Sequence, residues 1–98
     1  MNKTEHLLVI LSEECGEVIQ IVSKILRFGE YDHDPNNPES CNLDLMVKEI
    51  NDILGVVELL DEHEYDLSRV GNRNDIENKK SKVEFYMKYS KNLGKLHD

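Results

Sequence analysis

The stretch Leu11–Gly29, LSEECGEVIQIVSKILRFG, decides the fold class of this 98-residue chain. When a helix advances by about 100° per residue, the apolar residues of this stretch gather with Leu7 on one stripe. The stripe comprises Leu7, Leu11, Val18, Ile21, Ile25 and Phe28. Asn2 or Thr4 is a suitable N-cap, and Gly29 is a natural stop. The sequence therefore predicts a helix that runs to about Phe28.

A second apolar helix is predicted from about Leu43 to Leu60, with two apolar stripes side by side. The first stripe comprises Met46, Ile50, Ile53, Val57 and Leu60, and the second comprises Leu45, Val56 and Leu59. Between the two helices lie residues 29–42, GEYDHDPNNPESCN, which contain two prolines and three asparagines. This composition predicts a polar loop with at most a short turn of helix.

A third, basic helix is predicted from about Asp75, as its cap, to Asn92. The polar segment 61–74 before it could include a short helical piece around residues 65–70, and no stretch alternates as a strand would. The sequence thus predicts an all-α bundle in a single domain, 1–98, with the polar loop 29–42 and a basic C-terminal helix over 75–92. Since a chain of this size buries only roughly 60–65% of its surface on folding, we expect a homodimer or homotetramer to complete the core.

The net charge of -8 is divided unevenly along the chain. Residues 1–68 contain 4 basic and 16 acidic residues, whereas residues 69–98 contain 8 basic and 4 acidic residues. The acidic excess argues against a general nucleic-acid surface. An acidic body beside a basic tail suits the binding of a cation together with a polyanion, and two merely solvated faces are the alternative.

The longest unbroken apolar run, Leu7–Leu11, is far below the roughly 20 residues that a membrane span needs. The chain opens with no secretory leader pattern, so we expect a cytoplasmic protein without a membrane partner. Cys15 and Cys41 show no metal-binding spacing and are predicted to be free thiols.

Carboxylates interrupt the apolar stripes of both long helices. Glu14 falls in the middle of the first stripe, with Glu17 one turn on and Glu13 at the edge. Glu49 and Asp52 fall in line with the second stripe of the second helix. An unpaired buried carboxylate costs several kcal/mol, so these acids must be protonated, paired with Lys or Arg, or bound to a metal. An acidic surface in a different helix phase is the remaining alternative.

The spacing of these acids favours a metal. Pairs at i, i+3 on two packed helices would bring four carboxylates to one point, and ligation by carboxylates alone selects a hard cation, Mg²⁺ or Mn²⁺. A di-iron bundle instead needs Glu-x-x-His, but Gln20 follows Glu17 and Gly55 follows Asp52. The pattern therefore argues against di-iron.

Two motifs, Glu13-Glu14-Cys15-Gly16-Glu17 and Glu49-Ile50-Asn51-Asp52, resemble the EExxE and ExxD signature of the MazG-type all-α nucleoside triphosphate pyrophosphohydrolases. The flanking sequences LSEECGEVIQIVSKILRFG and EINDILGVVELL also resemble small, single-domain members, and the resemblance covers most of residues 7–62. It implies Mg²⁺-dependent cleavage of a nucleoside triphosphate between the α and β phosphates, which gives the monophosphate and pyrophosphate. Mn²⁺ is the expected substitute.

Carried over to this chain, the resemblance implies Glu14, Glu17, Glu49 and Asp52 as metal ligands. It makes Glu13 a further ligand or a residue that positions water, and these five form the expected catalytic set. The chain departs from compact members in the 31 residues between Glu17 and Glu49. The resemblance therefore predicts the type of reaction more firmly than it predicts the base of the substrate. A phosphoribosyl-ATP pyrophosphohydrolase and a non-catalytic helical dimer that binds a divalent ion are the alternatives.

The phosphates of such a substrate would need cationic or hydroxyl partners. The candidates are Lys24, Arg27, Lys79, Lys82 and Tyr86, although any one of them taken alone is better explained as a solvated side chain. His33, Asn36 and Asn37 could read or cover a base, and Tyr31 or Phe28 could stack on it, with core packing the commoner fate of Phe28.

Overall fold

The computed structural model describes all residues, 1–98, and contains three helices and no strand: α1 (Lys3–Phe28), α2 (Asn42–His63) and α3 (Arg73–Asn92). The all-α fold class is therefore confirmed. The chain divides into two compact units, residues 1–67 and 68–98. This division falls within one residue of the change from acidic to basic sequence. No helix combines the length and the apolar character needed to cross a membrane.

Helix α1 begins and ends where the sequence predicts. The Asn2 side chain accepts a hydrogen bond from the Glu5 N–H at 2.8 Å, and the Glu5 carboxylate accepts one from the Asn2 N–H at 3.3 Å. This reciprocal capping box satisfies two N–H groups that the helix itself cannot pair. At the other end Gly29 has φ 96°, a conformation that favours glycine, and its N–H donates to the Ile25 carbonyl.

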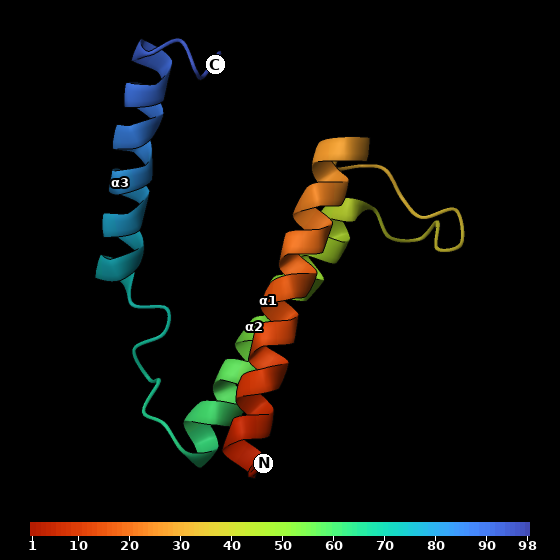
Figure 1. Ribbon diagram of the computed structural model, residues 1–98, viewed down its shortest axis with the longest axis vertical. Helices are drawn as coiled ribbons and strands as arrows, with labels where there is room; N and C mark the ends of the chain where they lie inside the picture. The colour runs from red at the N-terminus through yellow and green to blue at the C-terminus, as the bar shows by residue number, and fades with distance from the viewer. The chain divides into compact units, whose positions relative to one another are not determined.

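Helices α1 and α2 pack side by side as an antiparallel hairpin (Figure 1). Leu7, near the start of α1, meets Val56 and Leu60, near the end of α2, and this cluster forms the core. Leu67, just beyond α2, packs against the same cluster, and its N–H donates to the Asp61 carboxylate at 2.7 Å. This bond draws residues 64–67 back onto the hairpin.

Two sequence expectations near the core are wrong. The segment 65–70 forms turns and no helical piece, because Leu67 folds back onto the hairpin and Gly71 takes φ 89°. The loop over residues 29–41 contains turns and no helix, which agrees with the predicted polar loop. Phe28 does not pack in the core: its side chain is 60% exposed and the Arg27 guanidinium lies over its ring at 5.0 Å from the centroid. Both cysteines are free, as predicted.

One side of the hairpin remains apolar and uncovered. Each helix carries a second apolar stripe, rotated by roughly 100° around the helix axis from the stripe that packs in the interface. The rotation has the same sense in both helices when each is followed along the chain. Because the helices are antiparallel, the two second stripes face the same side of the hairpin. The stripes comprise Leu8, Ile19, Val22 and Leu26 on α1, and Leu43, Val47, Ile50 and Leu54 on α2. Leu26 is 82% exposed and Ile19 is 71% exposed.

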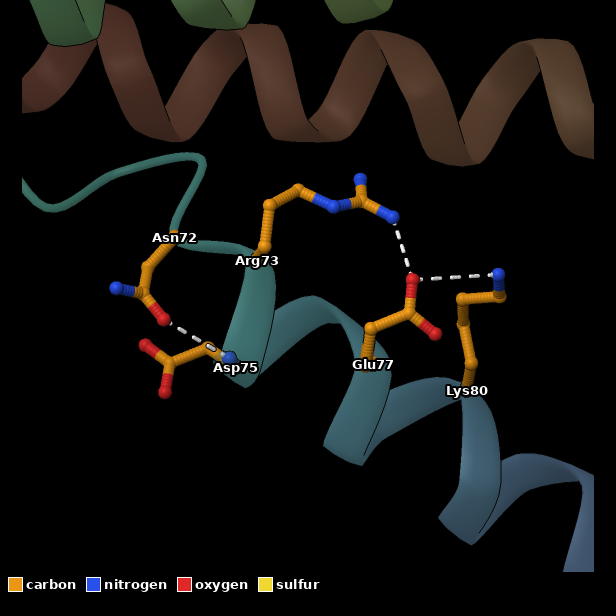
Figure 2. Close-up of polar contacts among 5 residues, drawn as sticks. All are labelled: Asn72, Arg73, Asp75, Glu77 and Lys80. Carbon is orange, nitrogen blue, oxygen red and sulfur yellow. Dashed lines mark hydrogen bonds and ion pairs between the residues drawn. The ribbon is translucent and has the colours of Figure 1, made fainter.

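Helix α3 is held by polar contacts at its first turns (Figure 2). Asn72, and not the predicted Asp75, is the N-cap, since the Asn72 side chain accepts from the Asp75 N–H at 3.0 Å. One carboxylate oxygen of Glu77 then pairs with both Arg73 and Lys80, one turn before and one turn after it. No residue of α3 is buried. Its stability therefore comes from capping and ion pairs, which together contribute only about 1–2 kcal/mol.

Candidate metal centre

Three of the predicted acids come together between α1 and α2. Glu14 of α1 and Glu49 and Asp52 of α2 each offer a carboxylate oxygen, and these oxygens all lie within 4.8 Å of one another. All three side chains are half-buried. The interface that packs the hairpin therefore also creates the acidic group, because each acid stands where the apolar stripe would otherwise continue.

The positions of Glu49 and Asp52 follow from the phase of α2. The residues at 42, 45, 49, 52 and 56 recur at i, i+3, i+4 and i+7, and each of them is buried or half-buried. The two acids thus share a face with Leu45 and Val56, but not with Leu59, the third residue of the predicted stripe. Two other stripe residues, Ile50 and Leu59, lie outside the contact and are 44% and 43% exposed.

Glu17 and Glu13 lie outside this three-residue group. Both are exposed on α1, and neither belongs to the group of oxygens that converge. The negative charge of Glu17 is nevertheless close enough to raise the pKa of Glu14. Glu17 thus contributes to the field at the acidic group, whereas Glu13 points to solvent.

The Glu14 carboxyl has a pKa raised above its ordinary value of 4.5. The largest cause is removal of the carboxylate from water in the helix interface, followed by repulsion from Asp52, Glu49 and Glu17. Lys48 acts in the opposite direction and lowers the pKa. The protein alone therefore leaves an excess of negative charge here that a cation would neutralise.

Lys48 contacts the acidic group, and sequence reasoning missed it. Its ammonium group donates to the Asp52 Oδ2 at 2.7 Å, one turn along α2. The hydrogen bond and the charges of Asp52 and Glu49 raise the pKa of Lys48. The signal was present as a Lys–Asp pair at i, i+4, a spacing that supports such contacts. Its side chain is 64% exposed, so the pair is open to exchange with a metal ion.

This donor set suits a hard divalent cation. Three carboxylates from two rigid helices supply oxygen ligands only, which Mg²⁺ and Mn²⁺ prefer. A six-coordinate ion with three protein ligands keeps positions for water and for phosphate oxygens. The group can therefore serve as a site at which a metal meets a phosphorylated substrate.

The predicted phosphate ligands fall into two sets. Lys24 and Arg27 are exposed near the end of α1, within the hairpin unit. Lys79, Lys82 and Tyr86 belong to the second unit, where they line one cavity of about 410 Å³ on α3. Lys95 also lines it, because the chain turns back after Gly94, where the Lys95 N–H donates to the Ser90 carbonyl at 2.8 Å. Sequence reasoning did not identify Lys95.

Comparison of the chain with protein-family models, with curated proteins and with solved structures gave no match.

Proposed function

We propose that this chain is a small MazG-type nucleoside triphosphate pyrophosphohydrolase that uses Mg²⁺ to convert a (d)NTP to the (d)NMP and pyrophosphate. The convergence of Glu14, Glu49 and Asp52 from two separate helices carries this proposal. Each belongs to the sequence motif that suggested the reaction. Because the proposed substrates are nucleotides of the cell interior, the proposal also places the protein in the cytoplasm.

The three acids would hold the ion by one carboxylate oxygen each. Bound Mg²⁺ supplies neutralisation of phosphate charge and lowers the pKa of a coordinated water. Water adds its oxygen to the α or β phosphorus and gives up a proton to the solvent. The α–β anhydride bond breaks, and the group on its other side, pyrophosphate or the monophosphate respectively, leaves with the bonding electron pair. No side chain is needed as a nucleophile. Glu17, whose charge acts on Glu14, could bind a further ion, and the resemblance gives Glu13 the role of a further ligand or of a residue that positions water.

Lys48 occupies part of this site when no ion is bound. Its ammonium group neutralises Asp52, which lowers the repulsion among the three acids. An incoming divalent ion would displace it from Asp52, and the freed ammonium group would then lie within reach of a phosphate. We therefore assign Lys48 two successive partners, a carboxylate in the free protein and a phosphate oxygen in the complex.

We further propose that a second copy covers the apolar side of the hairpin. Only Leu7, Ile21, Val56 and Leu60 are buried apolar residues, whereas the uncovered stripes expose eight large ones. So small a core cannot offset the chain entropy of two long helices. The charged residues lie on the opposite side of the hairpin from the uncovered apolar stripes; they are Glu17, Lys24, Lys48 and Asp52. Pairing through the apolar side would therefore leave the acidic group open to solvent.

The test is a screen of ribo- and deoxyribonucleoside triphosphates with Mg²⁺, scored for pyrophosphate against orthophosphate. Pyrophosphate release by the wild type, lowered at least about a hundredfold in Glu14→Gln and Asp52→Asn, is the expected result. Glu58→Gln is the matched control, because Glu58 is exposed on α2 and lies outside the acidic group. Ion binding with no pyrophosphate from any nucleotide would instead favour a non-catalytic metal-binding dimer.

A further inference from the structure

A second cavity, of about 400 Å³, lies in the hairpin unit between the end of α1, the loop over residues 29–41 and the start of α2. Its size falls within the range of roughly 300–1,000 Å³ found for small-molecule sites. Lys24 and Phe28 of α1 line it, together with five loop residues, Asp32, His33, Asp34, Pro35 and Asn37. The acidic group accounts for none of these residues.

The loop that forms its wall is tied at both ends. Asn42, only 4% exposed, donates from its side chain to the Gly29 carbonyl at 3.0 Å and from its backbone to the Asp32 carbonyl at 2.8 Å. The Leu43 N–H donates to the Glu30 carbonyl at 2.9 Å. The first N–H groups of α2, which have no partner within a helix, are thus satisfied by the loop.

A turn inside the loop fixes the Asp34 carboxylate. Its Oδ1 accepts from the Asn36 N–H at 2.8 Å, and its carbonyl accepts from the Asn37 N–H at 2.8 Å. The second oxygen, Oδ2, remains available to a ligand, because a carboxylate accepts through both oxygens. The cavity wall is therefore organised before a ligand arrives, which lowers the entropic cost of binding.

The lining combines three kinds of chemistry. Phe28 and Leu45 supply apolar surface, and the exposed Phe28 ring suits contact with a planar ligand. An ionised carboxylate can accept hydrogen bonds but cannot donate them, so Asp32 and Asp34 select ligands that carry hydrogen-bond donors. Lys24 supplies a positive charge, and Arg27 lies over the Phe28 ring. A flat ring with donors at its edge and a negative charge attached to it meets all three requirements.

The cavity also lies on the same face as the acidic group. Leu45 lines the cavity and stands one turn before Glu49 on a single stripe of α2, a separation of about 6 Å along the axis. On α1, Lys24 follows Glu17 by seven residues and so falls on the same side of the helix. The phosphates of a ligand held in the cavity could therefore extend along this face toward the metal ligands.

We infer that this cavity binds the base of a nucleotide, and that Asp32 and Asp34 make it select bases with an exocyclic amino group (adenine, cytosine or guanine) over thymine and uracil. The direction of the phosphates rests on the proposed function, but binding of the base does not. In thymine and uracil, a carbonyl oxygen takes the place of the amino group of cytosine, so that only the ring N3–H is left as a donor and the oxygen would repel a carboxylate. Guanine also has a carbonyl oxygen, but its N1–H and 2-amino group together present adjacent donors to a carboxylate.

The test measures binding of the product-like monophosphates dCMP, dAMP, dGMP, dTMP and dUMP to the full chain, by calorimetry and by amide NMR shifts. We expect the three amino-bearing nucleotides to bind at least about tenfold more tightly than dTMP and dUMP, with the shifts centred on residues 32–37. Asp34→Asn keeps the oxygen that accepts from Asn36 and so preserves the turn, while it removes the anionic acceptor. This variant should lose most of the preference.

Glu39→Gln is the matched control, because Glu39 is an exposed acid of the same loop that does not line the cavity. It should behave as the wild type. Equal affinity for all five nucleotides, shifts that avoid the loop, or an unchanged preference in Asp34→Asn with its loop spectrum intact would each overturn the inference. Pyrophosphate release with a preference for dTTP or dUTP would overturn it and leave the proposed function standing. Selective, Asp34-dependent binding without any hydrolysis would support the inference and refute the proposed function.

Discussion

The raised pKa of Glu14 predicts how the affinity for a metal depends on pH. A divalent ion binds the ionised carboxylate, so a protonated Glu14 must first lose its proton. Below the pKa of Glu14, release of one proton per ion makes the dissociation constant rise about tenfold for each unit that the pH falls. Since the pKa is raised from 4.5, this loss of affinity begins at a higher pH than an ordinary glutamate would give.

Mn²⁺ titrations between pH 4.5 and 7, followed by calorimetry, would measure this dependence in the wild type, Glu14→Gln and Glu17→Gln. Glu14→Gln should bind more weakly at neutral pH and lack the Glu14 contribution to the pH slope. Glu17→Gln should shift the onset to lower pH, because it removes one of the charges that raise the pKa of Glu14. An identical slope in the wild type and Glu14→Gln would refute Glu14 as a ligand that titrates on binding.

The same pKa gives the opposite sign for stability in the absence of metal. The folded state binds the Glu14 proton more tightly than the unfolded state, so protonation of Glu14 stabilises the fold. This stabilisation is fully present below about pH 4.5, where Glu14 is protonated in both states. It is lost as the pH rises through the raised pKa. Urea unfolding of the ion-free protein should therefore show that the stability of the wild type relative to Glu14→Gln falls as the pH rises through this window.

Three further predictions follow from the charges. Mg²⁺ or Mn²⁺ at about 100 times its dissociation constant should add about 2.7 kcal/mol to the free energy of unfolding. Calorimetry should then show a rise in Tm of roughly 10–20 °C. An unchanged Tm at millimolar ion would count against a preformed site. Lys48→Met should tighten Mn²⁺ binding and raise KM for nucleotide, because it removes both the competing cation and the phosphate partner; weaker ion binding would contradict this role. Replacing Lys79 and Lys82 with Ala should raise KM several-fold and leave Mg²⁺ binding unchanged, and unaltered kinetics would make α3 a structural element.

Much of the hairpin was predictable because its signals are local. Asn2, Gly29 and the apolar periodicity fix α1 without reference to any other element. The placement of Glu14, Glu49 and Asp52 followed from the same periodicity, since an acid in line with apolar residues must enter the interface. Their mutual distance could not follow from it, because it depends on the register between two helices.

The failures have equally specific causes. Asn72 and Asp75 are both good caps, three residues apart, and the choice depends on which residue leaves the helical conformation first. The turns at 65–70 arise from the contact of Leu67 with a core that the local sequence does not show. Lys48 was missed because a long side chain reaches a neighbouring face of its own helix, which the angular position of its Cα around the helix does not show.

The acidic group explains why this hairpin has so little core of its own. Glu14, Glu49 and Asp52 occupy half-buried positions where leucine would add buried apolar surface, so the hairpin lacks that contribution to its stability. Repulsion among the acids adds to this loss until a cation is bound. Stability must then come from outside the α1–α2 contact, and the uncovered stripe from Leu8 to Leu26 on α1 offers apolar surface for it. A bound ion and a second copy would thus stabilise different sides of the same two helices, so that each would strengthen the other by favouring the packed hairpin.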